Sequence, residues 1–386
     1  MKVIKALGFR PFFSGAALAA IISMLAWMSV YLFQLPIEMF RISVFQWHAH
    51  EMIFGYAMAV IAGFLLTAAR NWTGHETLIG TGLGWLFAAW LMARLLMLAG
   101  TQWIALAALA DMLFMLGLGV AVARPILKVK QKRQAPVLLI LGLLIAANAL
   151  FYLGAGGYIR EGARLGIYGG LYLVLGIVLF MGNRVIPFFT ERGVDYAVKM
   201  TNSRKNDITT FILFPLFMLS ELLLPGHTAG AVLATGLVVS NSIRVKGWYT
   251  PGIWQKPLLW GLFAAFAIIN LGFLLRALVP VSSLTGYIPI HAFAVGGVGM
   301  LTLAMMARVT LGHTGRGIRQ APRIVTPMLL TIALTTFVRV AMPLIDPSHY
   351  RLWIAVSAIL WILSFIQFSA VFIPMLLKPR VDGKPG

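Results

Sequence analysis

Long apolar stretches, separated by short polar segments, follow one another along almost the whole chain. They recur from Pro11 nearly to the C-terminus, and most approach the roughly 20 residues that a helix needs to cross a bilayer. No stretch remains for a soluble domain, so residues 1–386 are expected to form a single polytopic membrane domain. The pattern predicts an all-α bundle of about twelve transmembrane helices, at residues 11–33, 47–69, 78–98, 101–123, 135–153, 164–183, 208–224, 227–243, 258–279, 287–311, 323–345 and 350–376.

Composition agrees with a bilayer environment and narrows the possible chemistry. Hydrophobic residues make up 60% of the chain and charged residues 11%, and the mean hydropathy is +0.89, far from an ordinary soluble domain. The chain has no cysteine, which excludes disulfides, thiolate metal sites and iron–sulfur clusters. A metal would therefore be held by nitrogen, oxygen or methionine sulfur, and the seven histidines are the first candidates.

The formal net charge of +20 indicates membrane topology rather than nucleic-acid binding. The basic residues lie in short loops, where they orient the helices and meet anionic lipid. With the N-terminus in the cytoplasm, roughly 24 of the 31 Lys and Arg residues fall on the cytoplasmic face, as the positive-inside rule requires. Both halves of the chain obey this rule only if the weakly apolar eighth helix exists. We therefore expect both termini on the cytoplasmic side.

The helices predicted at 47–69 and 287–311 resemble each other at an offset of 241 residues. The helix at 164–183 shows a weaker likeness to them. Similar helices at the second, sixth and tenth positions indicate a four-helix unit used three times, a kind of repeat that frames central sites in membrane proteins. The matching positions of the second and tenth helices are His50 with His291, Gly55 with Gly296, and Thr73-Gly74 with Thr314-Gly315.

A cluster of ionisable residues opens the second helix, in the sequence WHAHEM at 47–52. Such residues beside hydrocarbon are costly unless they face the protein interior, so they are a functional hypothesis by default. In a regular helix His48 and His50 point about 200° apart, so one metal can bind both only if the segment is irregular. His48 and Glu51 would share a face, with His50 pointing elsewhere. His291 lies at the matching depth of the tenth helix.

Two interpretations of these histidines remain open. Neutral imidazole binds haem iron, copper and zinc, so the pair on the second and tenth helices could hold a metal or haem. His48, His50, His291 and Glu51 are the leading metal ligands, followed by Met52 and His313. Alternatively, His48 and His50 are interfacial residues that hydrogen-bond to loop carbonyls.

Charged residues in other predicted helices are further candidates for a functional site. Arg94 and Arg339, near the ends of the third and eleventh helices, could bind haem propionates or extend to the membrane interface. Asp111 and Glu221 lie within predicted helices, where an acid serves a proton relay or a structural pair with arginine. Arg276 lies near the end of the ninth helix, on the same side as Arg94 and Arg339.

Several longer motifs resemble those of the NnrS family, and the likeness covers almost the whole chain. One departure is Arg70, where the family pattern has proline. The motifs are GFRPFF at 8–13, WHAHEM at 47–52, AGFLLTA at 62–68, NWTG at 71–74, RVIPFFT at 184–190, and HA at 291–292 leading to ARVTLGHTGR at 307–316.

The resemblance implies a multi-pass protein of the bacterial inner membrane that is associated with haem and copper and with the response to nitric oxide and nitrosative stress. On this basis His50 and His291 would hold a b-type haem, with Arg94 and Arg339 at its propionates. A copper ion would bind His48, Glu51 and Met52. The helix count also resembles haem-copper oxidases, which arrange twelve helices in three arcs. The oxidase copper ligands lie on helices six and seven, which contain no histidine here.

The leading functional hypothesis is a haem protein that binds, senses or reduces nitric oxide. Reduction would make it a haem-dependent oxidoreductase that takes electrons from a quinol or cytochrome and protons through Asp111 or Glu221. The alternative is a twelve-helix secondary transporter whose buried His, Asp and Arg side chains bind substrate or proton. A third hypothesis is a membrane scaffold without a ligand.

Overall fold

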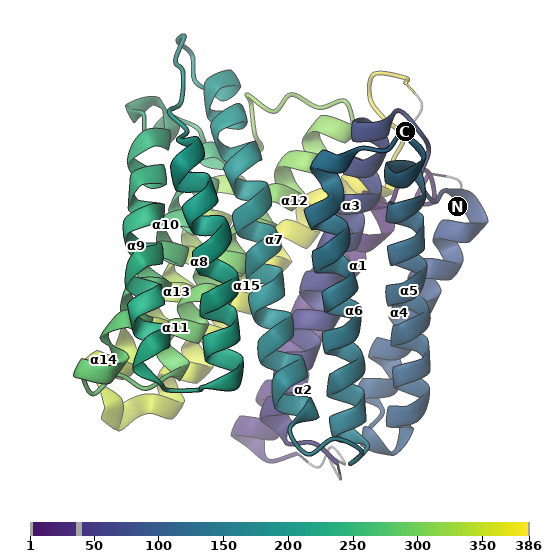
Figure 1. Cartoon of the computed structure of the whole chain (residues 1–386). Coiled ribbons are helices and arrows are strands. Elements are labelled where there is room, and N and C mark those ends of the chain that lie inside the picture. Colours follow the sequence, from purple (N-terminus) through teal and green to yellow (C-terminus); the bar gives the residue numbers. More distant parts are fainter. Residues whose placement is uncertain (1–2, 36–40, 385–386) are drawn as a thin grey trace. The chain divides into compact units, whose positions relative to one another are not determined.

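A computed structural model describes residues 3–35 and 41–384 (Figure 1). Helices and the loops between them make up this part of the chain, which contains no strand. Within it, twelve helical spans are long and apolar enough to cross a membrane. The predicted all-α, twelve-helix fold is therefore confirmed, and the chain is a multi-pass membrane protein by the length and composition of its helices.

The helices agree closely with the apolar stretches from which they were predicted. The weak eighth span exists as α9. The α-helices are α1 (Phe9–Phe33), α2 (Val44–His50), α3 (Met58–Thr73), α4 (Gly80–Leu98), α5 (Ile104–Lys128), α6 (Ala135–Ala155), α7 (Gly162–Gly193), α8 (Arg204–Leu223), α9 (Thr228–Trp248), α10 (Pro257–Leu278), α11 (Tyr287–His291), α12 (Met300–His313), α13 (Val325–Val340), α14 (Met342–Ile345) and α15 (Tyr350–Leu377).

The sixth span differs most from its prediction, because α7 continues to Gly193 instead of ending near residue 183. Hydropathy falls at Arg184, but the helix does not stop there. The Arg184 guanidinium lies over the Phe180 ring at 4.2 Å, and that of Arg192 lies over the Phe188 ring at 4.1 Å. Cation–π contacts of this kind let a basic residue remain on a helix face, so the helix extends beyond the apolar run.

The second and tenth spans each change from α-helix to π-helix immediately after a histidine. The π-helix η1 (Glu51–Ala57) follows His50, and η6 (Ala292–Gly299) follows His291. π-Helical turns are rare and occur frequently at functional sites. The predicted repeat therefore extends to an unusual backbone feature that hydropathy does not reveal.

The ends of these two spans also match. Gly74 and Gly315 both have positive φ, at 68° and 77°, the left-handed conformation that glycine adopts after a helix. The threonine before each glycine donates a hydrogen bond from its hydroxyl to a carbonyl of the preceding helical turn. Thr73 Oγ1 donates to the Ala69 carbonyl at 2.7 Å, and Thr314 Oγ1 donates to that of Thr310 at 2.6 Å.

The chain divides into two compact units. Unit 1 comprises Met1–Val174, Val309–Arg316 and Phe365–Gly386, and unit 2 comprises Leu175–Arg308 and Gly317–Ser364. The single-domain prediction and the oxidase-like arrangement in three arcs therefore stay predictions.

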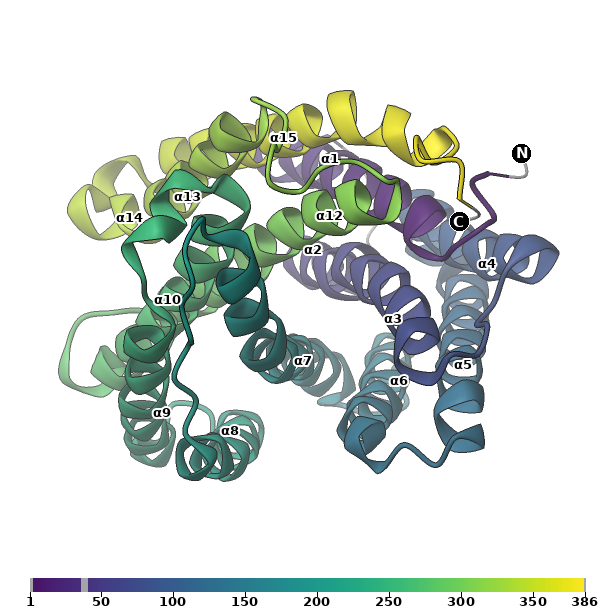
Figure 2. The same cartoon turned by 90° about the horizontal axis from the view of Figure 1, so that it is seen from above.

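Within unit 1, α3 packs against both α1 and α5, and α5 also packs against α4 and α6 (Figure 2). Gly63 of α3 faces Phe13 of α1, and a Cβ atom at Gly63 would lie 2.8 Å from that ring. The small residue thus lets the two helices approach closely. The two described ends of the chain meet in the same unit, where Arg10 Nη1 donates to the carbonyl of Leu376 at 2.7 Å.

Within unit 2, η6 packs against α10 and α13, and α9 packs against α8 and α10. Gly296 in η6 faces Thr336 of α13, where a Cβ atom would lie 2.5 Å from the threonine methyl group. Gly55, the position of η1 that aligns with Gly296, also has a close neighbour, since a Cβ atom there would lie 3.0 Å from Arg94 Nη1.

Candidate functional site

A cluster of six polar side chains lies in the interior of unit 1. Four helical segments contribute to it: the junction of α2 and η1, and α4, α5 and α6. Each member is 8% exposed or less. Polar groups in such a position must satisfy one another. The members, which we call the unit 1 cluster, are His50, Glu51, Arg94, Asp111, Asn148 and Tyr152.

Arg94 joins the two acids of the unit 1 cluster. Its Nη1 lies 2.7 Å from Glu51 Oε1, and its Nη2 lies 2.6 Å from Asp111 Oδ2. The same oxygen of Asp111 accepts hydrogen bonds from Asn148 Nδ2 at 3.2 Å and from the Tyr152 hydroxyl at 2.9 Å. One guanidinium thus contacts two carboxylates, and α6 supplies neutral donors to one of them.

His50 completes the unit 1 cluster. Its Nδ1 lies 3.1 Å from Glu51 Oε1, and its Nε2 lies 3.0 Å from Asn148 Oδ1 and 3.6 Å from Asp111 Oδ2. The imidazole stacks on Phe151 with a centroid distance of 4.1 Å. Both ring nitrogens therefore face oxygen atoms of the protein.

The predicted directions of the side chains in the WHAHEM segment are wrong. We expected Glu51 to share a face with His48, but Glu51 contacts His50, and the His48 ring lies against Trp27 with a centroid distance of 4.6 Å. The helix changes to a π-helix at Glu51, so α-helical spacing no longer sets the side-chain directions. His48 and His50 themselves both lie in the α-helix α2, so the irregular backbone begins only after them.

His291 has a different environment in unit 2. Its Nδ1 lies 2.7 Å from the carbonyl oxygen of Tyr287 one turn earlier, so that nitrogen donates. Its Nε2 lies 3.0 Å from Arg339 Nη2, and since a guanidinium can only donate, Nε2 accepts. His291 is therefore a neutral imidazole whose Nδ1–H is fixed by the backbone and whose Nε2 presents a lone pair.

Glu221 forms a structural pair rather than joining the histidines. Its Oε1 lies 2.6 Å from Arg276 Nη2, and that nitrogen also approaches the His227 carbonyl at 3.3 Å. The contact joins α8, α10 and the start of α9. Of the two open interpretations of Glu221, this geometry favours the pair with arginine.

The residues predicted to bind haem differ in how well their contacts suit that role. Haem-ligating histidines usually donate one ring N–H to a carbonyl or carboxylate and bind iron through the other nitrogen, and His291 has this arrangement. His50 does not fit as a ligand, because both of its nitrogens face oxygen atoms inside a buried network, whereas Nε2 of His291 accepts from a donor. Arg94 does not fit as a propionate partner, because its guanidinium holds two carboxylates, whereas Arg339 lies beside the fitting histidine.

The predicted copper ligands do not converge. Among the described residues, no group of three His, Asp or Glu side chains could hold a metal ion. Met52 is half-buried in η1. The ring of His313 lies against Phe9 with a centroid distance of 5.5 Å. The copper site stays a prediction.

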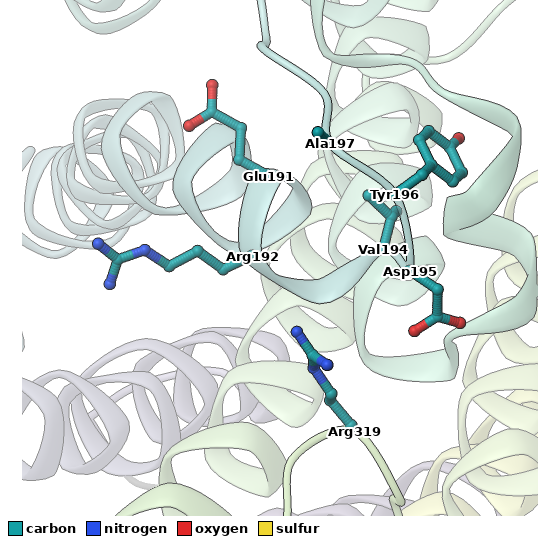
Figure 3. Close-up of a pocket in the computed structure, with 7 residues that line it drawn as sticks. All are labelled: Glu191, Arg192, Val194, Asp195, Tyr196, Ala197 and Arg319. Atoms are coloured by element: carbon teal, nitrogen blue, oxygen red, sulfur yellow. The ribbon is translucent and has the colours of Figure 1, made fainter.

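A separate pocket opens on the surface of unit 2 at the end of α7 (Figure 3). Three of its charged side chains have protein partners. Asp195 binds Lys256 at 2.8 Å, and that hydrogen bond lowers the pKa of the Asp195 carboxyl. Glu191 accepts from the Met200 amide at 2.8 Å, and Arg192 covers an aromatic ring. The pocket contains none of the predicted site residues, so it does not carry the candidate chemistry.

Asn148 and Tyr152 were missed in the sequence. Both belong to α6, whose span has a mean hydropathy of 2.4, and Asn148 is the one amide side chain within it. A polar residue inside such an apolar helix is a signal in itself, because it needs a buried partner. The partner's identity, however, depends on how α5 and α6 pack.

None of the curated proteins compared with the chain matches it. The family model described as NnrS protein matches residues 3–380, nearly the whole chain. That match includes both histidine-containing π-helical spans and the unit 1 cluster. The chain therefore belongs to the NnrS family.

Proposed function

We propose that this chain is a haem-binding protein that binds nitric oxide through an iron held by His291. Membership of the NnrS family supports a membrane protein of the nitric oxide response. The observation that carries the cofactor proposal is the state of His291, whose Nδ1 is fixed by the Tyr287 carbonyl and whose Nε2 presents a lone pair. Haem held by this single imidazole would supply an iron that can bind a diatomic gas.

The surrounding residues prepare His291 for this role. The backbone carbonyl selects the Nδ1–H tautomer, which makes Nε2 the ligating atom and increases its basicity. Arg339, now 3.0 Å from Nε2, would exchange this contact for an acidic group of the cofactor, for which a guanidinium is well shaped. The excess of basic residues in alternate loops supports a place in the bacterial inner membrane.

The test is an absorption spectrum of protein purified in detergent from cells supplied with haem. We expect a Soret band in the wild type that shifts when nitric oxide is added without oxygen, and its loss in His291→Ala. His50→Gln should keep the band, since His50 is not a ligand in this proposal. The control is His349→Ala, which alters an exposed histidine paired with Asp346.

A full Soret band in His291→Ala would refute the ligand assignment. Loss of the band in both His291→Ala and His50→Gln would support the predicted two-histidine site instead. A second arm measures nitric oxide consumption with a reduced quinol or cytochrome, which separates a reductase from a binding protein.

The second candidate function is a secondary transporter. It is favoured by a specific observation, the charged network at 0–8% exposure in unit 1, because buried ionisable groups mark ion and proton pathways in carriers. A colourless wild type from haem-supplied cells, together with substrate-dependent proton uptake in vesicles, would support this function instead.

A further inference from the structure

The unit 1 cluster contains one more acid than it has fixed cations. Glu51 and Asp111 supply two negative charges when ionised, and Arg94 supplies one positive charge. The six side chains are at most 8% exposed, and an uncompensated charge in such surroundings is costly. The cluster is neutral only if it binds one further proton.

The contacts of His50 indicate where that proton resides. Both ring nitrogens face oxygens, at 3.1 Å for Glu51 Oε1 and 3.0 Å for Asn148 Oδ1. The Asn148 amide is oriented because its nitrogen donates to Asp111, so its oxygen must accept from His50. A neutral imidazole has one N–H and would set a lone pair against one of these oxygens.

We propose that the unit 1 cluster is a proton-binding site in which one exchangeable proton is held on His50 and can pass to Glu51. In the transfer the Nδ1–H bond breaks, an Oε1–H bond forms, and imidazolium and carboxylate become imidazole and carboxylic acid. The cluster therefore stays neutral throughout. This inference does not rest on the haem proposal, because a protein that moves protons and one that consumes them both need such a site.

The charged and titratable groups that face His50 come from each of the neighbouring segments. Glu51 begins η1, Arg94 lies on α4, Asp111 on α5 and Tyr152 on α6, with the Tyr152 and His50 rings 5.2 Å apart. The proton count therefore depends on Glu51, Asp111 and Arg94, while Tyr152 donates a hydrogen bond.

The related span in unit 2 provides an internal comparison. His50 is followed by Glu51, whereas His291 is followed by Ala292 at the same point of the repeat. Without the neighbouring acid, His291 accepts from Arg339 instead of donating from both nitrogens. The same histidine position before a π-helix thus has a protonated state in one copy and a neutral state in the other.

The test uses ¹⁵N-histidine magnetic resonance on the full-length protein, with His50→Gln to assign the signal. In the wild type we expect two protonated nitrogens on His50 and one on His291, and we expect the His50 protons to exchange in deuterated solvent. Asp111→Asn leaves Glu51 balanced by Arg94, so His50 should lose its second proton. Combining Asp111→Asn with Arg94→Gln leaves Glu51 alone and should restore it.

Glu221→Gln is the matched control, since it removes a mostly buried acid that is paired with Arg276 in unit 2. It should leave the His50 signal unchanged. Gel filtration checks that each variant is folded, and Glu51→Gln tests the same charge count if Asp111→Asn is not. A single protonated nitrogen on His50 in the wild type, or a signal that does not respond to either substitution, would overturn the proposal. Loss of the Soret band alone bears on the haem proposal and not on this one.

Discussion

Replacing Arg94 by glutamine should destabilise the protein more than any other single change in the unit 1 cluster. The substitution removes the cation 2.7 Å from Glu51 and 2.6 Å from Asp111, and the glutamine amide supplies no charge in its place. Two carboxylates then share the single proton on His50. Removing one partner of a buried ion pair costs about 3–5 kcal/mol.

The expected cost corresponds to a shift of the unfolding equilibrium by roughly one hundred-fold to several thousand-fold, at about 1.4 kcal/mol for each factor of ten. Arg276→Gln provides a comparison, because Arg276 faces Glu221, whose side chain is 11% exposed. Arg276 has one carboxylate partner, and that carboxylate is closer to solvent than those of the unit 1 cluster, so the loss should lie at or below the lower end of that range.

Reversible unfolding in mixed detergent micelles, followed by tryptophan fluorescence, measures these differences. Arg94→Gln combined with Asp111→Asn should be more stable than Arg94→Gln alone, because Glu51 and His50 then balance each other. If Arg94→Gln cost less than about 1 kcal/mol, as for a surface ion pair, or if the two substitutions were simply additive, the charge-balance reasoning would be refuted.

Three further predictions concern glycines and the C-terminal segment. Gly230→Ala should destabilise the protein by about 1–3 kcal/mol in thermal unfolding, because its Cβ would overlap Glu221 Oε1 and lie 2.7 Å from Arg276 Nη2. Gly142→Ala, with nothing within 4 Å, is the control and should change little. Gly74→Ala should cost about 1–2 kcal/mol because of its positive φ, and Gly315→Ala should cost more in the same assay, since its Cβ would also meet Asp382 Cγ at 2.8 Å. Equal losses would contradict this contact. The hydrogen bond from Arg380 lowers the pKa of Asp382 from 3.8 to about 2, so the pair is fully formed above the ordinary pKa and is lost as the pH falls through about 2. Protection of the Val381 amide, which bonds to the Thr314 carbonyl at 3.1 Å, should follow that change in hydrogen exchange, and its loss at higher pH would show that another group controls the segment.

The sequence by itself determined the twelve spans, because burial in a bilayer requires long apolar runs that are visible locally. It also determined the likeness of the second and tenth helices. Their shared histidines, glycines and threonines correspond to π-helices and left-handed glycine caps in both copies. The C-terminal end of α7 could not be predicted. Hydropathy falls at Arg184, which indicates the end of a span, but the contact of Arg184 with the Phe180 ring lets this charge remain on the helix.

Tertiary structure decided what the ionisable residues do. His50 and His291 are equivalent in the sequence pattern, yet Asn148, 98 residues away, occupies one nitrogen of His50, whereas Arg339, 48 residues away, donates to His291. From the sequence, Arg94 could bind a haem propionate or extend to the membrane interface, and packing of α4 against α5 brought Asp111 to it instead. Local sequence sets the helix and its hydrophobicity, but the direction of a side chain changes by about 100° for each residue. The π-helical turn at Glu51 and the packing of three other helices therefore determined which partners each charge meets.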